Sequence, residues 1–279
     1  MKKIFITYAD AKYSSTLPRI KNHAKALGLF DKVICYSDKD LIGGGEVADF
    51  VLVRYPKRAG YWIWKPYLIL KTLQKYPDAV VVYTDAGCTL NANMQEWSRW
   101  FDLMQDNDLL VTHYRRDGDY GWEHVFGTKS IAIETWTRKM VMDYFDGLFR
   151  HQQWHQKEKL LAGFMMCKIG AKPLLQEWLN LMLLHPEFLV DMPEEKEQYP
   201  SFITHRHDQS LLTAFVYYYQ EKKNLHIALL PETAESDKTA AVVASRIRTY
   251  NAPHLKTRVI QWIKKTLGEK FYNRVHFWH

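Results

Sequence analysis

An aspartate at position 85 follows directly after a short β-branched run, Ala79–Thr84. A continuous apolar run of this length is typical of a strand that is buried on both faces. In an open α/β sheet, ligands bind at the carboxyl ends of the strands, so Asp85 is placed to meet a divalent cation or a sugar. Ala86 and Gly87 would let a ligand come close to the backbone. The same residues also suit a plain turn, because Asp and Gly are common in turns.

A second carboxylate, Asp208, lies in the polar segment His205–Ser210, which leads directly into the apolar stretch Leu211–Phe215. Two histidines, an arginine and an aspartate at the start of a helix are an unusual concentration of side-chain chemistry. Asp208 is either the cap of this helix, which is a common use of Asp, or a catalytic carboxylate. His207 stands beside it.

A lysine and two tryptophans form the third group, in the sequence Gly60–Pro66. Pro66 suits the first turn of a helix, and the apolar residues that follow it, Tyr67, Leu68, Leu70 and Leu73, give that helix an apolar face. Lys65 then stands at a helix N-terminus, where backbone amides and an ammonium group together suit a phosphate. Trp62 either packs in the core or faces a sugar ring.

The elements that must position these residues begin with a β-α-β pattern. Strands are expected at Lys2–Tyr8 and Lys32–Tyr36, with a helix between them that starts near Thr16 and stops at Gly28. This order favours a parallel sheet of the nucleotide-binding type. Tyr8, at the end of the first strand, is either a base-stacking aromatic or a core residue.

Further strands and helices alternate along the chain. Strands are expected at Leu109–His113, Leu160–Cys167 and His226–Leu230, and helices at Gln95–Gln105, Thr128–Trp154 and Pro173–Leu184. Gly163 interrupts the apolar strand Leu160–Cys167 at a point where close approach would be useful. The chain is therefore expected to form an α/β fold with helices flanking a central sheet.

Length and composition agree with one large domain or two small ones. The chain has 279 residues, of which 47% are hydrophobic and 25% charged, so a substantial core can form. The net charge of +7 favours anionic partners such as nucleotide phosphates, nucleic acid or an acidic membrane surface. The three cysteines, Cys35, Cys88 and Cys167, are isolated, which indicates a reducing cytoplasm.

The C-terminal residues are basic and aromatic. From Arg246 to His279 there are eight Lys and Arg residues and a single acid, Glu269. The part Val259–Leu267 is amphipathic, and a basic amphipathic helix with Trp and Phe is typical of membrane-surface binding. The alternative is that it docks on the domain. The N-terminal apolar stretch is too short for a signal peptide, and no apolar run is long enough to span a bilayer.

Several function classes have no support in the sequence. There is no Gly-x-Ser-x-Gly elbow of a serine hydrolase, no His-Glu-x-x-His zinc motif and no kinase or P-loop signature. No helix-turn-helix or zinc module is apparent either, so no specific nucleic acid is expected as a partner.

The order of the motifs resembles that of bacterial GT-A-type glycosyltransferases of capsule and lipopolysaccharide O-antigen assembly. The resemblance rests on Trp64-Lys65-Pro66, Asp85-Ala86-Gly87, Leu160–Met166 and His207-Asp208-Gln209. The layout is also similar to that of the glycogenin-like and Och1-like transferases. It implies a GT-A, Rossmann-like fold with a mixed, mostly parallel sheet in one domain, residues 1–235, followed by a basic, aromatic and helical extension, residues 236–279.

The resemblance also implies roles for single residues. Asp85 matches the first aspartate of the metal-binding Asp-x-Asp motif, but Gly87 stands at the second position, which puts a manganese or magnesium cofactor in doubt. Asp208 matches the general base of inverting members. Donor contacts are implied for Asp85 and expected from Tyr8, Lys65, Arg246 and Arg248, and acceptor-side positions at Trp62, Gly163 and His207.

The implied reaction is the transfer of a hexose, with galactofuranose one candidate, from a UDP-sugar to a hydroxyl group of a growing polysaccharide or lipid-linked glycan. The protein would be cytoplasmic and peripheral at the inner face of the membrane, with the C-terminal extension meeting anionic lipid. The alternative is a non-catalytic protein that binds nucleotide sugars or glycans on a degenerate transferase scaffold.

Overall fold

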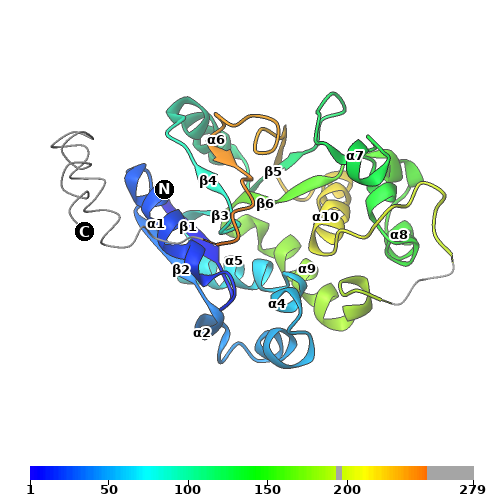
Figure 1. The fold of residues 1–279 in the computed structure, drawn as a ribbon, viewed down its shortest axis with the longest axis horizontal. Coiled ribbons are helices and arrows are strands. Elements are labelled where there is room, and N and C mark those ends of the chain that lie inside the picture. The colour runs from blue at the N-terminus through cyan, green and yellow to red at the C-terminus, as the bar shows by residue number, and fades with distance from the viewer. Residues whose placement is uncertain (193–196, 250–279) are drawn as a thin grey trace, which may run out of the picture.

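The computed structural model describes residues 1–192 and 197–249. Within these ranges, six strands form one sheet in the order β2-β1-β3-β6-β5-β7 (Figure 1). The strands are β1 (Lys2–Tyr8), β2 (Lys32–Tyr36), β3 (Ala79–Thr84), β5 (Leu109–His113), β6 (Leu160–Cys167) and β7 (Ile227–Pro231). Strand β6 runs antiparallel to both of its neighbours, and the other adjacent pairs are parallel. The expected mixed, mostly parallel sheet in a single α/β domain is therefore confirmed.

Strand β3 lies inside the sheet, where it pairs with β1 and β6, and all of its residues are buried. Its side chains alternate between two hydrophobic cores, as the pleat of a strand requires. Val81 and Tyr83 belong to the larger core, whereas Val80 and Val82 belong to the smaller one. A continuous β-branched run fits this place because both faces of the strand are covered.

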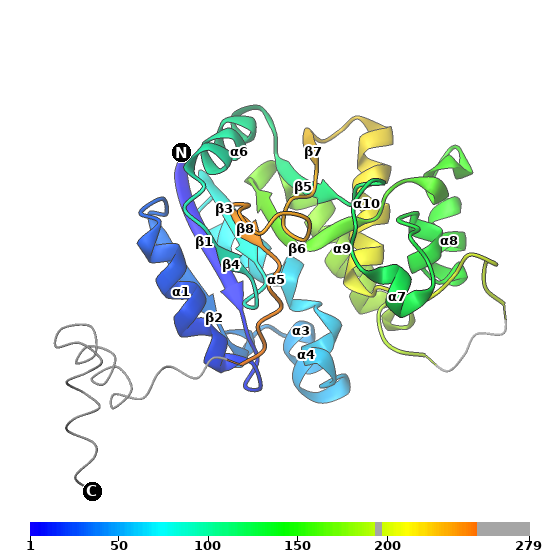
Figure 2. The same cartoon turned by 45° about the horizontal axis from the view of Figure 1, so that its top comes forward.

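Helices cover both faces of the sheet (Figure 2). They are α1 (Leu17–Ala26), α2 (Asp38–Leu41), α3 (Glu46–Asp49), α4 (Arg58–Tyr61), α5 (Trp64–Lys75), α6 (Met94–Asp106), α7 (Trp122–Phe126), α8 (Lys139–Asp146), α9 (Lys172–Leu184) and α10 (Asp208–Lys222). Helices α5, α9 and α10 bury their apolar residues in the larger core, and α1 and α6 bury theirs in the smaller one.

Part of the predicted C-terminal extension packs against the domain. Strands β4 (Thr89–Leu90) and β8 (Val242–Val243) form a small antiparallel sheet, and Asn91 Nδ2 donates to the carbonyl oxygen of Ala240 at 2.8 Å. Farther on, the Ile247 amide donates to the carbonyl oxygen of Gly87 at 3.1 Å. Residues 236–249 therefore cross the loop that follows β3.

The predicted amphipathic segment Val259–Leu267 and its membrane role lie outside the described residues. No helix in the described ranges has the length and apolar character that crossing a bilayer requires.

The segment Thr128–Trp154, expected to be helical, is helical only in shorter pieces. It contains a 3₁₀ turn (Ile133–Trp136), helix α8 and the start of a second 3₁₀ turn (Gln152–Gln156). Hydroxyl side chains explain why its first part is not α-helical, because Thr128 Oγ1 accepts from the Ser130 amide at 3.0 Å and the Ser130 hydroxyl bonds Thr135 Oγ1 at 2.7 Å. Such local bonds offer the backbone an alternative to the helix.

Candidate functional site

A large cleft opens where the parallel strands of the sheet end. Its volume is about 1310 Å³, and its walls include Tyr8 from the end of β1, Asp85 after β3, Gly163 on β6 and Asp208 at the start of α10. The chain moves from β1 outward to β2 on one side and, later, to β3 on the other, so the strand order reverses between β1 and β3. Ligands of open α/β sheets bind at such a reversal, outside the carboxyl ends of the strands.

Lys65 joins the two carboxylates that the sequence singled out. Its Nζ lies 2.8 Å from Asp208 Oδ2 and 3.4 Å from Asp85 Oδ1. It also donates to the carbonyl oxygen of Ala162 at 3.1 Å. Lys65 and Asp208 are almost fully buried, with 3% and 4% of their surface exposed. The structure therefore brings the two aspartates into one cleft and gives them a shared cation.

Burial raises the pKa of Asp208 to about 6, against the opposite influence of the Lys65 ammonium group. Burial alone would lower the pKa of Lys65, but Asp208 and Asp85 together outweigh it, and the pKa is raised. At neutral pH Lys65 is therefore charged and Asp208 is mostly ionised. A carboxylate whose pKa lies near neutrality is well suited to accept a proton.

Asp208 does not occupy the cap position of α10. His207 does, and its side chain makes no capping hydrogen bond to the described residues of this helix end. His207 has φ +49° and ψ −122°, a conformation that L-residues rarely adopt. Its imidazole holds this conformation: Nδ1 bonds the carbonyl oxygen of Leu189 at 2.7 Å, and Nε2 bonds Arg58 at 2.7 Å. A strained residue directly before Asp208 is consistent with a site in which the direction of that carboxylate is fixed.

Arg19, on α1, holds the loop that follows β3 by two hydrogen bonds. Its guanidinium donates to the carbonyl oxygens of Ala86 at 2.9 Å and Cys88 at 2.7 Å. The hydroxyl of Tyr83, on β3 itself, donates to Asp85 Oδ1. The position of the Asp85 carboxylate is therefore set by the strand and by a buried arginine on α1.

Two glycines allow the close approaches around Asp85. A Cβ atom at Gly163 would lie 3.2 Å from Asp85 Oδ2, and a Cβ atom at Gly87 would lie 3.0 Å from the carbonyl oxygen of Ile247. Gly163 was expected on the acceptor side of the cleft, and its direct neighbour is the Asp85 carboxylate. Gly87, in place of a second aspartate, makes room for the returning chain.

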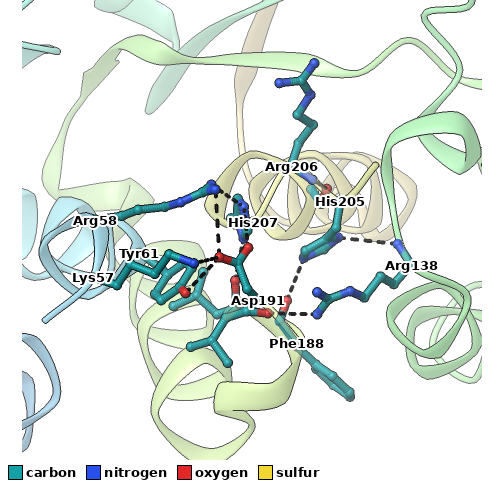
Figure 3. A network of polar contacts seen from close by, with 12 residues as sticks. Lys57, Arg58, Tyr61, Arg138, Phe188, Asp191, His205, Arg206 and His207 are labelled. Carbon is teal, nitrogen blue, oxygen red and sulfur yellow. Dashed lines mark hydrogen bonds and ion pairs between the residues drawn. The ribbon is translucent and has the colours of Figure 1, made fainter. Parts of the chain in front are cut away.

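A polar network ties together the turn before Trp62, the segment around Asp191 and the start of α10 (Figure 3). Asp191 Oδ2 lies 2.6 Å from Lys57 Nζ and accepts from the Tyr61 hydroxyl at 3.0 Å. Burial acts to raise the pKa of Asp191, but Lys57 and Tyr61 outweigh it, and the pKa is lowered. This network fixes His207, which was expected to meet the acceptor, by its bonds within the protein.

Trp62 lines the cleft next to this network, with its ring 5.5 Å from that of His207. It ends a run of five residues, Arg58–Trp62, that all have φ between +50° and +70°. Only one of the five is a glycine, Gly60, whose Cβ would lie 2.6 Å from Val51 Cγ2. This left-handed turn presents the Trp62 ring to the cleft at the cost of backbone strain.

The remaining residues expected to bind a donor differ in their exposure and in their contacts within the protein. Tyr8 is buried, with 3% of its surface exposed, and its hydroxyl donates to Asp38 Oδ1. Arg246 lies 2.7 Å from Glu235 Oε1, and Arg248 is exposed at the wall of the cleft. Lys65, expected to meet a phosphate from a helix N-terminus, instead has both aspartates as partners.

Asp85 was expected to bind a metal ion, but few of the described side chains near it could serve as further ligands. In residues 1–192 and 197–249, no three side chains of His, Cys, Asp or Glu gather into a group that could hold a metal ion. Lys65 already lies between the two carboxylates where a bridging cation would sit. A divalent cation there would take its other ligands from a bound phosphate group and water. The metal role of Asp85 stays a prediction.

Among the charged residues of the cleft that had no role in the sequence analysis are Lys159, Asp191 and Arg206. Asp191 lies in a segment with the composition of a surface loop, and Lys159 directly precedes an apolar strand. Their positions depend on contacts with residues far away in the sequence. The available signals were a lysine next to an apolar strand and an arginine between two histidines.

Comparisons with known proteins give likenesses in fold only. No family model matches the sequence, and no curated protein matches it. A glycosyltransferase involved in the glycosylation of the major capsid of PBCV-1 is 9% identical, with a TM-score of 0.43, over 83% of this chain and 82% of that one.

Two further solved structures show similar likenesses. Mouse xyloside xylosyltransferase 1 is 13% identical, with a TM-score of 0.40, over 82% of this chain and 85% of that one. The 4-diphosphocytidyl-2C-methyl-D-erythritol synthase of Anaerococcus prevotii DSM 20548 is 8% identical, with a TM-score of 0.39, over 86% and 93%. All three TM-scores are below 0.5, so these likenesses carry no argument about function.

Proposed function

We propose that this protein is a nucleotide-sugar-dependent glycosyltransferase. The observation that carries the proposal is the placement of Asp85 and Asp208 in one cleft on either side of Lys65. The cleft opens at the carboxyl ends of the strands, and a buried carboxylate with a raised pKa in a cleft is a common mark of a catalytic site.

The donor nucleotide is assigned to the part of the cleft between the ends of β1 and β3. This is where the strand order reverses. Tyr8 and Asp10 line it on the β1 side, and Gly87 and Arg248 line it on the β3 side. A sugar attached to a diphosphate there would extend past Asp85 toward Asp208, with Arg248 as an exposed cation near the phosphates.

Asp208 is assigned as the general base of an inverting transfer. Its carboxylate takes the proton from an acceptor hydroxyl group while that oxygen attacks the anomeric carbon. The bond between the anomeric carbon and the diphosphate oxygen breaks, and the nucleoside diphosphate leaves with the electron pair. A positioned general base typically contributes about 10²- to 10⁴-fold to such a rate.

Lys65 keeps Asp208 ionised and in position. Its ammonium group favours the ionised form of Asp208 and fixes one of its oxygens at 2.8 Å. Among the described residues it is also the one cation in contact with both aspartates, so it places positive charge next to Asp85, where the diphosphate is assigned. In this proposal Lys65 supplies the positive charge between the two carboxylates.

The proposed substrates are those that the resemblance to GT-A-type glycosyltransferases implies. The donor is proposed to be a UDP-hexose, with UDP-galactofuranose among those to be tested. The acceptor is proposed to be a hydroxyl group of a growing capsular polysaccharide, O-antigen or lipid-linked glycan. A cytoplasmic enzyme working at the inner face of the membrane would meet both substrates.

The test is release of UDP from a panel of UDP-hexoses, measured with and without a glycan acceptor in manganese and in EDTA. Asp208→Asn is expected to lower the acceptor-dependent rate at least 100-fold and to change UDP affinity less than threefold. Asp117→Asn is the matched control, because Asp117 is exposed and pairs only with Arg115 in the described part of the chain.

Two results would decide against the proposal. If no UDP-hexose is consumed but UDP or the intact donor binds, the protein is a binding protein on a transferase scaffold. If Asp208→Asn retains the rate of the wild type, Asp208 is not the base.

A further inference from the structure

Lys159 is a buried cation inside an aromatic cage at the wall of the cleft. Its Nζ lies 3.6 Å from the ring centroid of Trp122, 3.9 Å from that of Trp136 and 4.6 Å from that of Tyr114. Only 3% of the residue is exposed. In the described part of the chain, no carboxylate lies within ion-pair distance of this ammonium group.

Arg206 is a second cation against the same aromatic wall. Its guanidinium carbon lies 4.7 Å from the ring centroid of Trp136 and 5.2 Å from that of Phe126. Its Nε is buried and has no hydrogen-bond partner in the part of the chain that the structure describes. Figure 3 shows the side chain pointing away from Asp191 and its network. Within residues 1–192 and 197–249, Arg206 also has no ion-pair partner.

The charges around this wall do not balance. Glu235 is the nearby carboxylate, and it already accepts from Arg246 at 2.7 Å and from the Tyr114 hydroxyl at 3.0 Å. Burial lowers the pKa of Lys159, Arg206 and Arg246 lower it further, and Glu235 acts in the opposite direction. Interactions with aromatic rings offset only part of the cost of burying a cation. An added anion would supply the missing partner.

The position of the two cations separates them from the donor site. Lys159 directly precedes β6, and β6 lies on the side of β3 away from β1, where the strand order reverses. Arg206 stands two residues before Asp208, the proposed base. Both residues line the cleft. A ligand against this wall would approach Asp208 from the side opposite the nucleotide, which is the side of the acceptor.

We propose that Lys159 and Arg206 bind the anionic group, a carboxylate or a phosphate, of the acceptor saccharide. The sugar ring lies against the aromatic residues of this wall, among which Tyr120, Trp122 and Phe126 line the cleft. The inference rests on the proposed glycosyl transfer, and it narrows the acceptor to an acidic or phosphorylated sugar.

The experiment compares the binding of glucuronate, glucose 6-phosphate and glucose to the full chain at fixed ionic strength, with UDP binding measured in parallel. The variants are Lys159→Met, Arg206→Gln and Arg206→Lys. Arg116→Gln is the matched control, because Arg116 is an exposed arginine that pairs with Glu158 and does not line the cleft. Melting temperatures show whether each variant is folded.

The wild type and Arg116→Gln are expected to bind at least one of the two anionic sugars at least tenfold more tightly than glucose. Arg206→Gln and Lys159→Met should lose this preference, Arg206→Lys should keep most of it, and UDP affinity should change less than twofold. Whichever of glucuronate and glucose 6-phosphate binds more tightly shows whether the site prefers a carboxylate or a phosphate.

Two results would overturn the inference. One is a wild type that does not distinguish the anionic sugars from glucose. The other is a loss of UDP affinity of tenfold or more in Arg206→Gln and Lys159→Met with the sugar preference intact, since the cations would then serve the donor diphosphate. If UDP does not bind the wild type but the sugar preference is present and is lost in the variants, the proposed function fails and the anion site stands.

Discussion

Lys65 Nζ lies 2.8 Å from Asp208 Oδ2, although the two residues are more than 140 positions apart in the chain. Both side chains are almost completely buried. An ion pair of this kind contributes little net stability compared with apolar residues, but removing one partner leaves an uncompensated buried charge. The pair is therefore best understood through what it does to the charge and direction of Asp208.

Lys65→Met is expected to lower the free energy of unfolding by about 3 to 5 kcal/mol, because Asp208 and Asp85 lose their shared cation. Urea denaturation at neutral pH measures this change. Lys71→Met on the same helix is the control, since Lys71 is exposed and should change stability by less than about 0.5 kcal/mol. The double variant Lys65→Met with Asp208→Asn should recover part of the loss. A stability of Lys65→Met equal to that of the wild type would contradict this account.

The rate of transfer is expected to depend on the ionisation of Asp208. Its pKa is raised to about 6 by burial, and a base acts in its deprotonated form. The value of kcat/KM should therefore rise about tenfold per pH unit below pH 6 and level off above it. In Lys65→Met the rise should move to higher pH, because Lys65 lowers the pKa of Asp208.

Acid also acts on the fold, so the folded fraction must be followed by circular dichroism at each pH. Burial lowers the pKa of His207 to about 4, so the unfolded chain binds more protons than the folded one between about pH 4 and 6.5. That contribution to stability is lost as the pH falls through this range. A pH-independent rate between pH 5 and 8 in fully folded protein would rule out Asp208 as the base.

The sequence predicted the strands well and the site only in part. Lys2–Tyr8, Leu109–His113 and Leu160–Cys167 agree with the structure, because strands that are mostly buried on both faces are apolar runs. Lys32–Tyr36 also agrees, although it is an edge strand that is only partly buried. The Lys65–Asp208 ion pair could not be read from either segment alone, since nothing in the spacing of one helix start says that it lies next to the other. Strands β4 and β8 are two residues long, too short for any periodicity to show.

Removal of divalent cations is expected to have a small effect. Lys65 already supplies a positive charge between Asp85 and Asp208, and Asp85 Oδ1 accepts from Tyr83. UDP affinity and the transfer rate should therefore change less than about threefold in EDTA, well under the tenfold that corresponds to 1.4 kcal/mol. Calorimetry with and without added manganese checks the affinity. A tenfold or larger loss in EDTA that manganese restores would show that Asp85 works through a metal.

Gly163→Ala is expected to weaken donor binding with little effect on folding. The added methyl group would lie 3.2 Å from Asp85 Oδ2, so the carboxylate must shift by a few tenths of an ångström. The change in unfolding free energy should stay within about 1 kcal/mol, because alanine also suits a strand interior better than glycine. Gly147→Ala is the control, since its methyl group would meet only the carbonyl oxygen of Tyr144, at 3.3 Å. Equal UDP affinity in Gly163→Ala and the wild type would show that Asp85 does not hold the donor.

The left-handed turn that presents Trp62 stores strain that a glycine can relieve. Ala59 has φ +50° and ψ +52°, a conformation that costs an L-residue about 1 to 2 kcal/mol and glycine very little. Ala59→Gly relieves this strain but also removes one half-buried methyl group. The net increase in the free energy of unfolding should therefore be about 0.5 to 1 kcal/mol. Ala26→Gly in the last turn of α1 should act in the opposite direction, by up to about 1 kcal/mol. Urea denaturation of both variants gives the comparison, and a destabilised Ala59→Gly would mean that the turn is not strained at this residue.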